Sequence, residues 1–324
     1  MQSPLFKLLV SLTLSGAALA QDGPPESYAE AFPDGLDALD TYSGGLNSLR
    51  YPRYAKTKWP WGKVPQYCYD DATGDTPDYC DVYHIEVYEI AYSDCASPTY
   101  VCRCNNSPMS IDTIARQYGK LPVKARQWNR YVTSYNGSEC SAYSVTTDLS
   151  FFGNCQGKQS VFFHELTHNL DRWVAGADLD ASYSDTSDWA DVISQDTCVT
   201  DGYAKSSWGE DYAQTGVVAA FDLKVASVNT LDVDCMSNQI NKVEDQLSGV
   251  LTGTGSCDRA WALSPTVCMG DEAGAACDDL RRDTKERAGT VASSVDVVPV
   301  PALSGEILEK VNGRKIEAAK KAGF

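Results

Sequence analysis

The segment VFFHELTHNLDRW, residues 161–173, is the most informative part of this 324-residue chain for both its fold and its chemistry. Its apolar side chains recur every three or four residues, which predicts a helix over residues 159–174 with one face in the core. The residues expected on that face are Phe162, Leu166, Leu170 and Trp173. The same helix carries two histidines and a glutamate, and their spacing indicates a metal site.

These polar residues have the HExxH spacing of a metal site. Residues four apart share one side of a helix, so the imidazoles of His164 and His168 converge with Glu165 beside them. Zinc accepts neutral imidazole nitrogens, and a catalytic zinc site has three protein ligands and one position open to water. We therefore expect Zn²⁺ on His164 and His168, with Glu165 as the general base.

Histidine is rare in this chain: there are three, and two of them lie in the HExxH segment. A chance match at that frequency arises in about one such sequence in a thousand. The alternative is a pair of helix histidines without a metal, but unpartnered imidazoles cost free energy in an apolar helix. His84 lies in an alternating, strand-like segment and is expected to be structural.

The third ligand is not a histidine in an HExxHxxGxxH pattern, because position 174 is Val174. Carboxylates are the remaining ligand type. Glu210 lies in the first turn of a second predicted helix, residues 208–225, from which it can point back at the metal. The structural alternative is a capping box, since Ser207 and Glu210 have its spacing.

This arrangement resembles the glutamate-ligand zinc peptidases of lethal-factor type over residues 164–221. Their pattern is HExxHxxD, then a tyrosine seven residues before E-D-[FY]-A-E. The resemblance implies Glu210 as the third ligand, Tyr203 as a transition-state stabiliser and Asp171 as a partner of a ligand histidine. A packed aromatic and an exposed carboxylate are the structural alternatives for the last two. Gln214 stands where many members have glutamate, which leaves a supporting hydrogen bond but weakens any ionic one.

A rival third ligand is Asp201. Deuterolysin-like zinc peptidases use an aspartate at a comparable distance after the second histidine, but their G-T-x-D context is missing around Asp201. Glu210 is therefore favoured. Over nearly the whole chain after residue 20, the sequence also resembles secreted fungal conidiation-specific proteins, through YVCRCNNSPMS, HELTHNLDRW and SWGEDYAQ. This broader resemblance implies little about mechanism.

The first 20 residues are predicted to be a signal peptide, because a lysine precedes an apolar run that ends in Ala-Leu-Ala. Residues 21–50 are expected to form an N-terminal arm or propeptide, 51–286 a zincin-like metallopeptidase domain, and 287–324 a linker and tail. The twelve cysteines of the exported chain predict a disulfide framework. Asn105 and Asn136 begin glycosylation sequences.

The formal net charge of −17 excludes phosphate backbones and anionic membranes as favourable partners. Strands are predicted over residues 83–92 and 144–152, and short helices over 111–118 and 123–131. We therefore expect a disulfide-stapled α+β fold, zincin-like, with a mixed or antiparallel sheet, an HExxH helix and a second ligand-bearing helix.

Together these features predict a secreted, extracellular, monomeric zinc endopeptidase that acts on protein or peptide substrates. The alternative is a secreted zinc-binding protein of the same fold without peptidase activity, acting as a binding or cell-wall module. A disulfide-stapled structural protein without metal is a third hypothesis, which the paired histidines disfavour.

Overall fold

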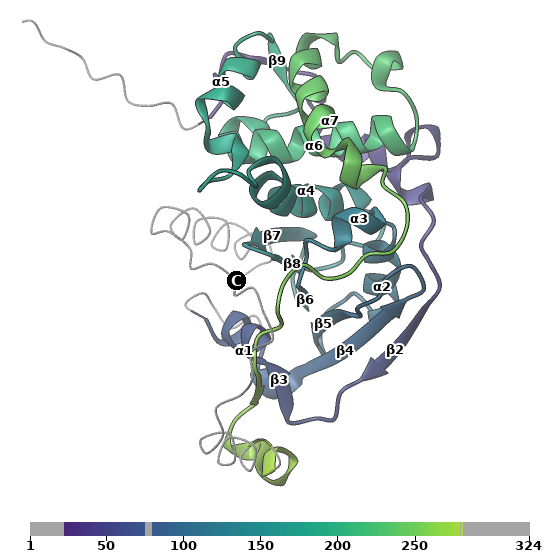
Figure 1. Cartoon of the computed structure of the whole chain (residues 1–324), viewed down its shortest axis with the longest axis vertical. Helices are drawn as coiled ribbons and strands as arrows, with labels where there is room; N and C mark the ends of the chain where they lie inside the picture. Colours follow the sequence, from purple (N-terminus) through teal and green to yellow (C-terminus); the bar gives the residue numbers. More distant parts are fainter. Residues whose placement is uncertain (1–22, 75–79, 279, 281–324) are drawn as a thin grey trace, which may run out of the picture.

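The computed structural model describes residues 23–74, 80–278 and 280 (Figure 1). The expected signal peptide, residues 1–20, and the expected linker and tail, residues 287–324, lie outside this range. The described chain has an α+β architecture, in which a six-stranded sheet is followed by a layer of helices.

The sheet has the strand order β2-β4-β5-β6-β8-β7. It consists of β2 (Tyr54–Lys58), β4 (Ile85–Tyr92), β5 (Thr99–Cys104), β6 (Tyr131–Tyr135), β7 (Ser141–Val145) and β8 (Asp148–Phe152). The β5–β6 and β6–β8 pairs are parallel and the other three pairs are antiparallel. The sheet is therefore mixed, and β7 forms the edge beside the helical layer.

Two sequence predictions about this sheet are wrong. The single strand expected over residues 144–152 is a hairpin, because the chain reverses at Thr146, whose φ is 56°. The helix expected over residues 123–131 ends early, as α3 (Val123–Arg126). Asn129 then donates to the carbonyls of Tyr131 and Thr147, which turns the chain into β6. In both cases long-range strand pairing overrides the local pattern.

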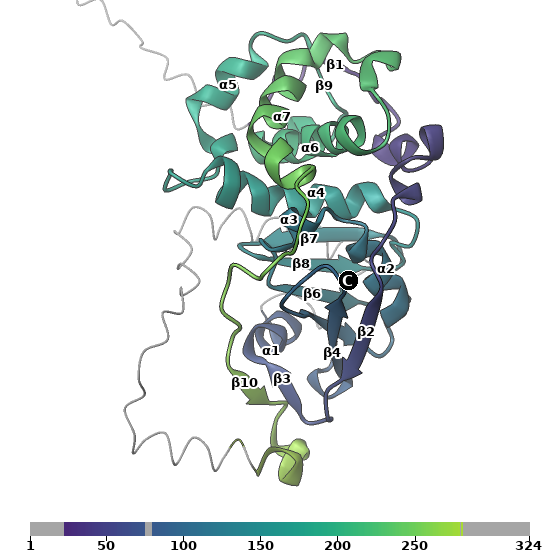
Figure 2. The same ribbon diagram turned by 45° about the vertical axis from the view of Figure 1, so that its right-hand side comes forward.

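The helical layer places the HExxH segment between the sheet and the later helices (Figures 1 and 2). The helices of this layer are α2 (Ile111–Gly119), α4 (Gln159–Leu170), α5 (Ser187–Ile193), α6 (Trp208–Lys224) and α7 (Ser237–Leu251). Phe162, Leu166 and Leu170 of α4 are buried as predicted, whereas Trp173 lies in the π-helical turn Asp171–Ala175 that continues α4 and is partly buried. This packing buries the apolar side of α4, and the two histidines lie on a different side of the helix.

The opposite face of the sheet has its own core under α1 (Gln66–Thr73). There the carboxylate of Asp71 accepts hydrogen bonds from the hydroxyl groups of Thr133, Tyr135, Tyr143 and Ser150. The short strands β3 (Lys63–Pro65) and β10 (Thr266–Cys268) pair beside α1. Hydroxyl donors satisfy this buried carboxylate, which gives it a structural role.

The segment expected as an N-terminal arm is packed into the domain core. Its strand β1 (Ala29–Glu30) pairs in parallel with β9 (Cys198–Val199). Leu36, Leu39 and Leu46 are buried in the same core as α4 and α6. The predicted domain boundary at residue 51 therefore does not separate two bodies.

All twelve cysteines form disulfides, as the even count predicted. The pairs are Cys68–Cys102, Cys80–Cys104, Cys95–Cys257, Cys140–Cys155, Cys198–Cys235 and Cys268–Cys277. Cys95–Cys257 joins positions 162 residues apart. Among the described residues, no helix has the length and apolarity needed to span a bilayer.

Candidate metal centre

The two histidines of α4 meet as the helical spacing predicts. The Nε2 atoms of His164 and His168 are 3.2 Å apart, and their rings are perpendicular with centroids 4.8 Å apart. Both residues are 7% exposed. Each ring therefore directs one nitrogen toward a shared, nearly dry point.

Glu210 completes this cluster from the first turn of α6. Its Oε2 lies 3.0 Å from Nε2 of His164 and 3.2 Å from Nε2 of His168. Its backbone N–H donates to the Ser207 hydroxyl, so the helix cap is present as well. The cap uses the main chain of Glu210 and leaves its carboxylate for the histidines. Among the described residues, these three form the one group of histidines, cysteines and acids with metal-binding geometry.

The close approach of α6 to α4 depends on Gly216. A Cβ atom at this position would lie 2.4 Å from Cγ2 and 2.6 Å from Oγ1 of Thr167. Thr167 is on α4, one residue before His168, and is buried. The missing side chain thus lets α4 and α6 lie close enough for Glu210 to reach the histidine rings.

A hydrogen-bonded relay behind His164 sets its tautomer. Nε2 of Gln214 donates to Oδ2 of Asp201 at 2.6 Å, and Oε1 of the same amide lies 2.9 Å from Nδ1 of His164. The carboxylate of Asp201 can only accept a hydrogen bond, so it binds the NH₂ group of Gln214. The carbonyl oxygen of Gln214 therefore faces the ring of His164. Nδ1 then carries the proton, and Nε2 presents its lone pair to His168 and Glu210.

The rival third ligand, Asp201, is therefore behind the centre rather than in it. Its Oδ1 accepts from the backbone N–H groups of Tyr203 and Ala204, while Oδ2 holds Gln214. It is absent from the group of convergent donor atoms in the described chain. Glu210, which the sequence also favoured as the third ligand, is thus the carboxylate that lies beside the two histidines.

The electrostatics of the centre favour positive charge. Burial lowers the pKa of His164, but the hydrogen bond that its protonated ring donates to Glu210, the charges of Glu165 and Glu210 and the contact with Gln214 outweigh burial, so the pKa is raised. A site that stabilises a proton on this ring offers the same negative potential to a metal cation.

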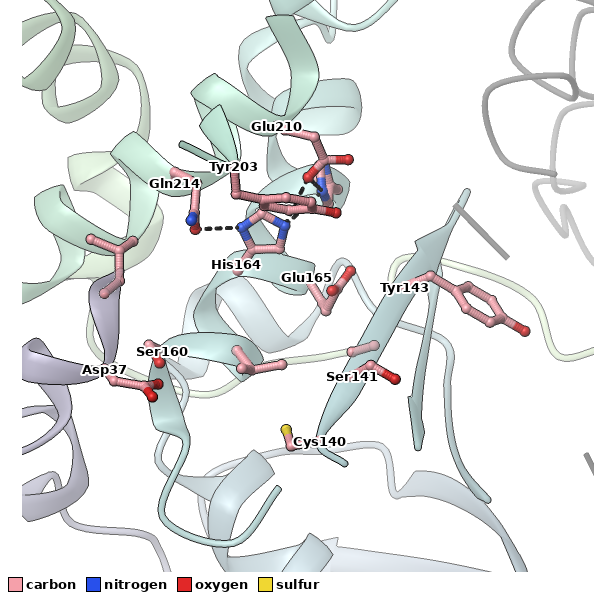
Figure 3. A pocket seen from close by; sticks show the side chains of 14 residues that line it. Asp37, Cys140, Ser141, Tyr143, Ser160, His164, Glu165, Tyr203, Glu210 and Gln214 are labelled. Carbon is pink, nitrogen blue, oxygen red and sulfur yellow. Dashed lines mark hydrogen bonds and ion pairs between the residues drawn. The ribbon is translucent and has the colours of Figure 1, made fainter. Parts of the chain in front are cut away.

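A pocket of about 190 Å³ opens beside the histidines. Glu165, Tyr203 and Gln214 line it together with residues of the edge strand β7 (Figure 3). Glu165 is 4% exposed and its charge acts on His164. The Tyr203 ring lies 5.8 Å from that of His164. Both predicted catalytic residues are therefore at the pocket.

Asp171 is buried directly after α4, so the exposed alternative for it is wrong. Its two carboxylate oxygens accept from the backbone N–H and the hydroxyl of Ser184, at 2.9 and 2.6 Å. Its proposed contact with a ligand histidine stays a prediction. His84 is exposed in the 3₁₀ turn Val82–His84 just before β4 and lines a separate pocket, and its structural assignment stays a prediction.

Sequence reasoning missed the contribution of the N-terminal segment to this site. Leu36 and Asp37 line the pocket, and both oxygens of Asp40 accept from Ser160 at the start of α4, each at 2.8 Å. These contacts join residues about 120 positions apart, and no local pattern marks them.

Comparison with known proteins identifies relatives over most of the chain. The family model described as conidiation-specific protein Con-13 matches residues 30–315. A relative named conidiation-specific protein 13, from Neurospora crassa, is 49% identical over 294 residues, which cover 90% of this chain and 85% of the relative. No solved structure matches. The chain belongs to the conidiation-specific protein Con-13 family.

Proposed function

We propose that this protein is a secreted zinc-dependent endopeptidase with a zincin-like catalytic centre. One observation carries the proposal: three buried acceptor atoms, from His164, His168 and Glu210, converge within 3.0–3.2 Å of one another. The six disulfides support an oxidising compartment. Peptide bonds are the proposed target.

A cation would stabilise these converging acceptor atoms. With the Nδ1 proton of His164 directed to Gln214, the lone pair of Nε2 faces Oε2 of Glu210 at 3.0 Å. Two acceptors at this distance repel unless a proton or a metal ion lies between them. Burial of all three side chains increases this repulsion, because water cannot screen it.

Zinc fits this donor set. Tetrahedral bonds of about 2.0–2.2 Å place neighbouring donor atoms about 3.3–3.6 Å apart. The observed separations are only slightly shorter, so small side-chain rotations suffice. Two imidazole nitrogens and one carboxylate oxygen are the donors of known catalytic zinc sites, and three protein ligands leave the fourth position to solvent or substrate.

When bound here, zinc would lower the pKa of a water molecule toward about 7 and polarise a carbonyl group. The chain's own residues do the rest. The carboxylate of Glu165 takes a proton from the attacking water and then donates it to the leaving amine nitrogen. The hydroxyl of Tyr203 donates a hydrogen bond to the oxygen that becomes negative as water adds to the peptide carbonyl.

The test combines metal content with proteolysis. We expect one zinc ion per chain in protein purified from a secreting host, and cleavage of an unfolded protein substrate that a chelator abolishes and zinc restores. Zinc without cleavage would leave the alternative of a zinc-binding module. Absence of zinc would refute both functions.

A further inference from the structure

The pocket beside the histidines has a wall that comes from the N-terminal segment. Leu36 and Asp37 lie on it, opposite residues of β7, and Ser160 and Val161 of α4 adjoin them. Figure 3 shows Asp37 and Ser160 together on the side of the pocket away from Glu210. We propose that this wall selects the substrate, with Asp37 binding a lysine or arginine side chain of the peptide; the inference rests on the proposed peptidase function.

The wall is held in place without substrate. Leu36 and Leu39 are buried in the main core, and both carboxylate oxygens of Asp40 accept hydrogen bonds from Ser160 of α4. The preceding residues are fixed by the pairing of β1 with β9, extended by Phe32 N–H to the Thr200 carbonyl at 2.7 Å. A preformed wall recognises a side chain without the entropic cost of ordering a loop.

The chemistry of the wall suits a long cationic side chain. Leu36 and Val161 offer apolar contact inside the pocket, and the Asp37 side chain is 61% exposed at its mouth. Lysine and arginine bury an aliphatic stem and keep the charged end near water, which matches a pocket with apolar side chains inside and a carboxylate at its mouth. Among the described residues that line the pocket, Asp37 is the charged group besides the centre and Glu165.

Lys158 shows that an ammonium group fits against Asp37, because its Nζ forms an ion pair with Oδ2 of that residue. The two side chains are 40% and 61% exposed, so the pair is weak and solvent-screened. Lys158 does not itself line the pocket. A cation from the substrate can therefore replace it, and removing Lys158 should strengthen substrate binding.

The experiment uses fluorescein-labelled, alanine-based peptides in which one position at a time is lysine or norleucine. Binding is measured by anisotropy on the zinc-loaded Glu165→Gln protein, and cleavage on the wild type. We expect one position at which lysine binds about three- to fivefold more tightly than norleucine. Asp37→Asn should abolish this ratio and Lys158→Met should increase it. The control, Asp34→Asn, removes an exposed charge nearby that does not line the pocket and should leave the ratio unchanged.

Equal binding of lysine and norleucine peptides at every position, or a ratio that survives Asp37→Asn, would overturn the inference even if the wild type cleaves peptides. An equal loss of the ratio in Asp34→Asn would also overturn it, by showing a general charge effect. An Asp37-dependent ratio without cleavage by the wild type would support the wall as a binding site and refute the peptidase function. The two failures are therefore distinguishable.

Discussion

Gln214 presents its carbonyl oxygen to Nδ1 of His164 at 2.9 Å, while its amide nitrogen is held by Asp201. The glutamine is thus the link through which the carboxylate of Asp201 controls which nitrogen of His164 carries the proton. A glutamate at position 214 would accept in the same way, but it would face the carboxylate of Asp201. The neutral amide and this aspartate therefore suit each other.

This relay predicts that Asp201→Asn weakens zinc binding without removing a ligand. Oδ1 of the new asparagine would still accept from Tyr203 and Ala204, so its NH₂ group would face Gln214 and turn that amide around. Nε2 of Gln214 would then donate to Nδ1 of His164, which puts the ring proton on the ligand nitrogen. We expect about 10–100-fold lower affinity, measured by competition with a chromogenic chelator.

Gln214→Leu should weaken affinity by a similar factor, and adding Asp201→Asn to it should have little further effect, because both changes act through one amide. Gln246→Leu, which removes a glutamine bonded to Tyr212, is the matched control and should leave affinity unchanged. Additive losses in the double variant would contradict the relay.

Glu210→Gln should cost more affinity than any change in the relay, since it removes the charge of a direct ligand from a buried cluster. We expect a loss greater than the roughly 100-fold upper limit for indirect partners. Zinc bound per chain, measured after dialysis by mass spectrometry of the metal, checks this. If Asp201→Asn released the metal and Glu210→Gln retained it, Asp201 would be the ligand.

Glu165→Gln should retain zinc and lose peptide hydrolysis by about 10²–10⁴-fold or more, because the amide cannot take a proton from water. The readouts are kcat/KM on a fluorogenic peptide and zinc content of the same sample. His168→Ala is the comparison and should lose both metal and activity. Unchanged cleavage by the Glu165→Gln protein would refute the role of this residue.

Gly216→Ala should destabilise the metal-free protein by about 1–3 kcal/mol, because the added methyl group meets Thr167 in a packed interior. Urea unfolding with the disulfides intact measures the change. A second substitution, Thr167→Ala, makes room and should recover part of the loss. Gly249→Ala on α7 is the control: nothing lies within 4 Å of its Cβ, so it should stabilise by about 0.4–1 kcal/mol. Equal effects at both glycines would contradict the close helix contact.

Several local features of this protein could be predicted from its residues alone. Helical spacing in residues 159–174 and 208–225 predicted α4 and α6, because amphipathic periodicity is a property of neighbouring residues. The i, i+4 relation placed His164 and His168 together for the same reason. The HExxH pattern also identified Glu165, and the even cysteine count indicated full pairing.

Other features depend on contacts between distant residues and became evident from the three-dimensional arrangement. The reversal at Thr146 and the early end of α3 follow from strand pairing in the sheet, which local propensity does not encode. The position of Glu210 beside His164 and His168 depends on how closely α6 packs against α4 at Gly216. The Asp37–Lys158 ion pair and the hydrogen bonds from Ser160 to Asp40 join segments more than a hundred residues apart, and contacts over such lengths leave no periodic signal in the chain.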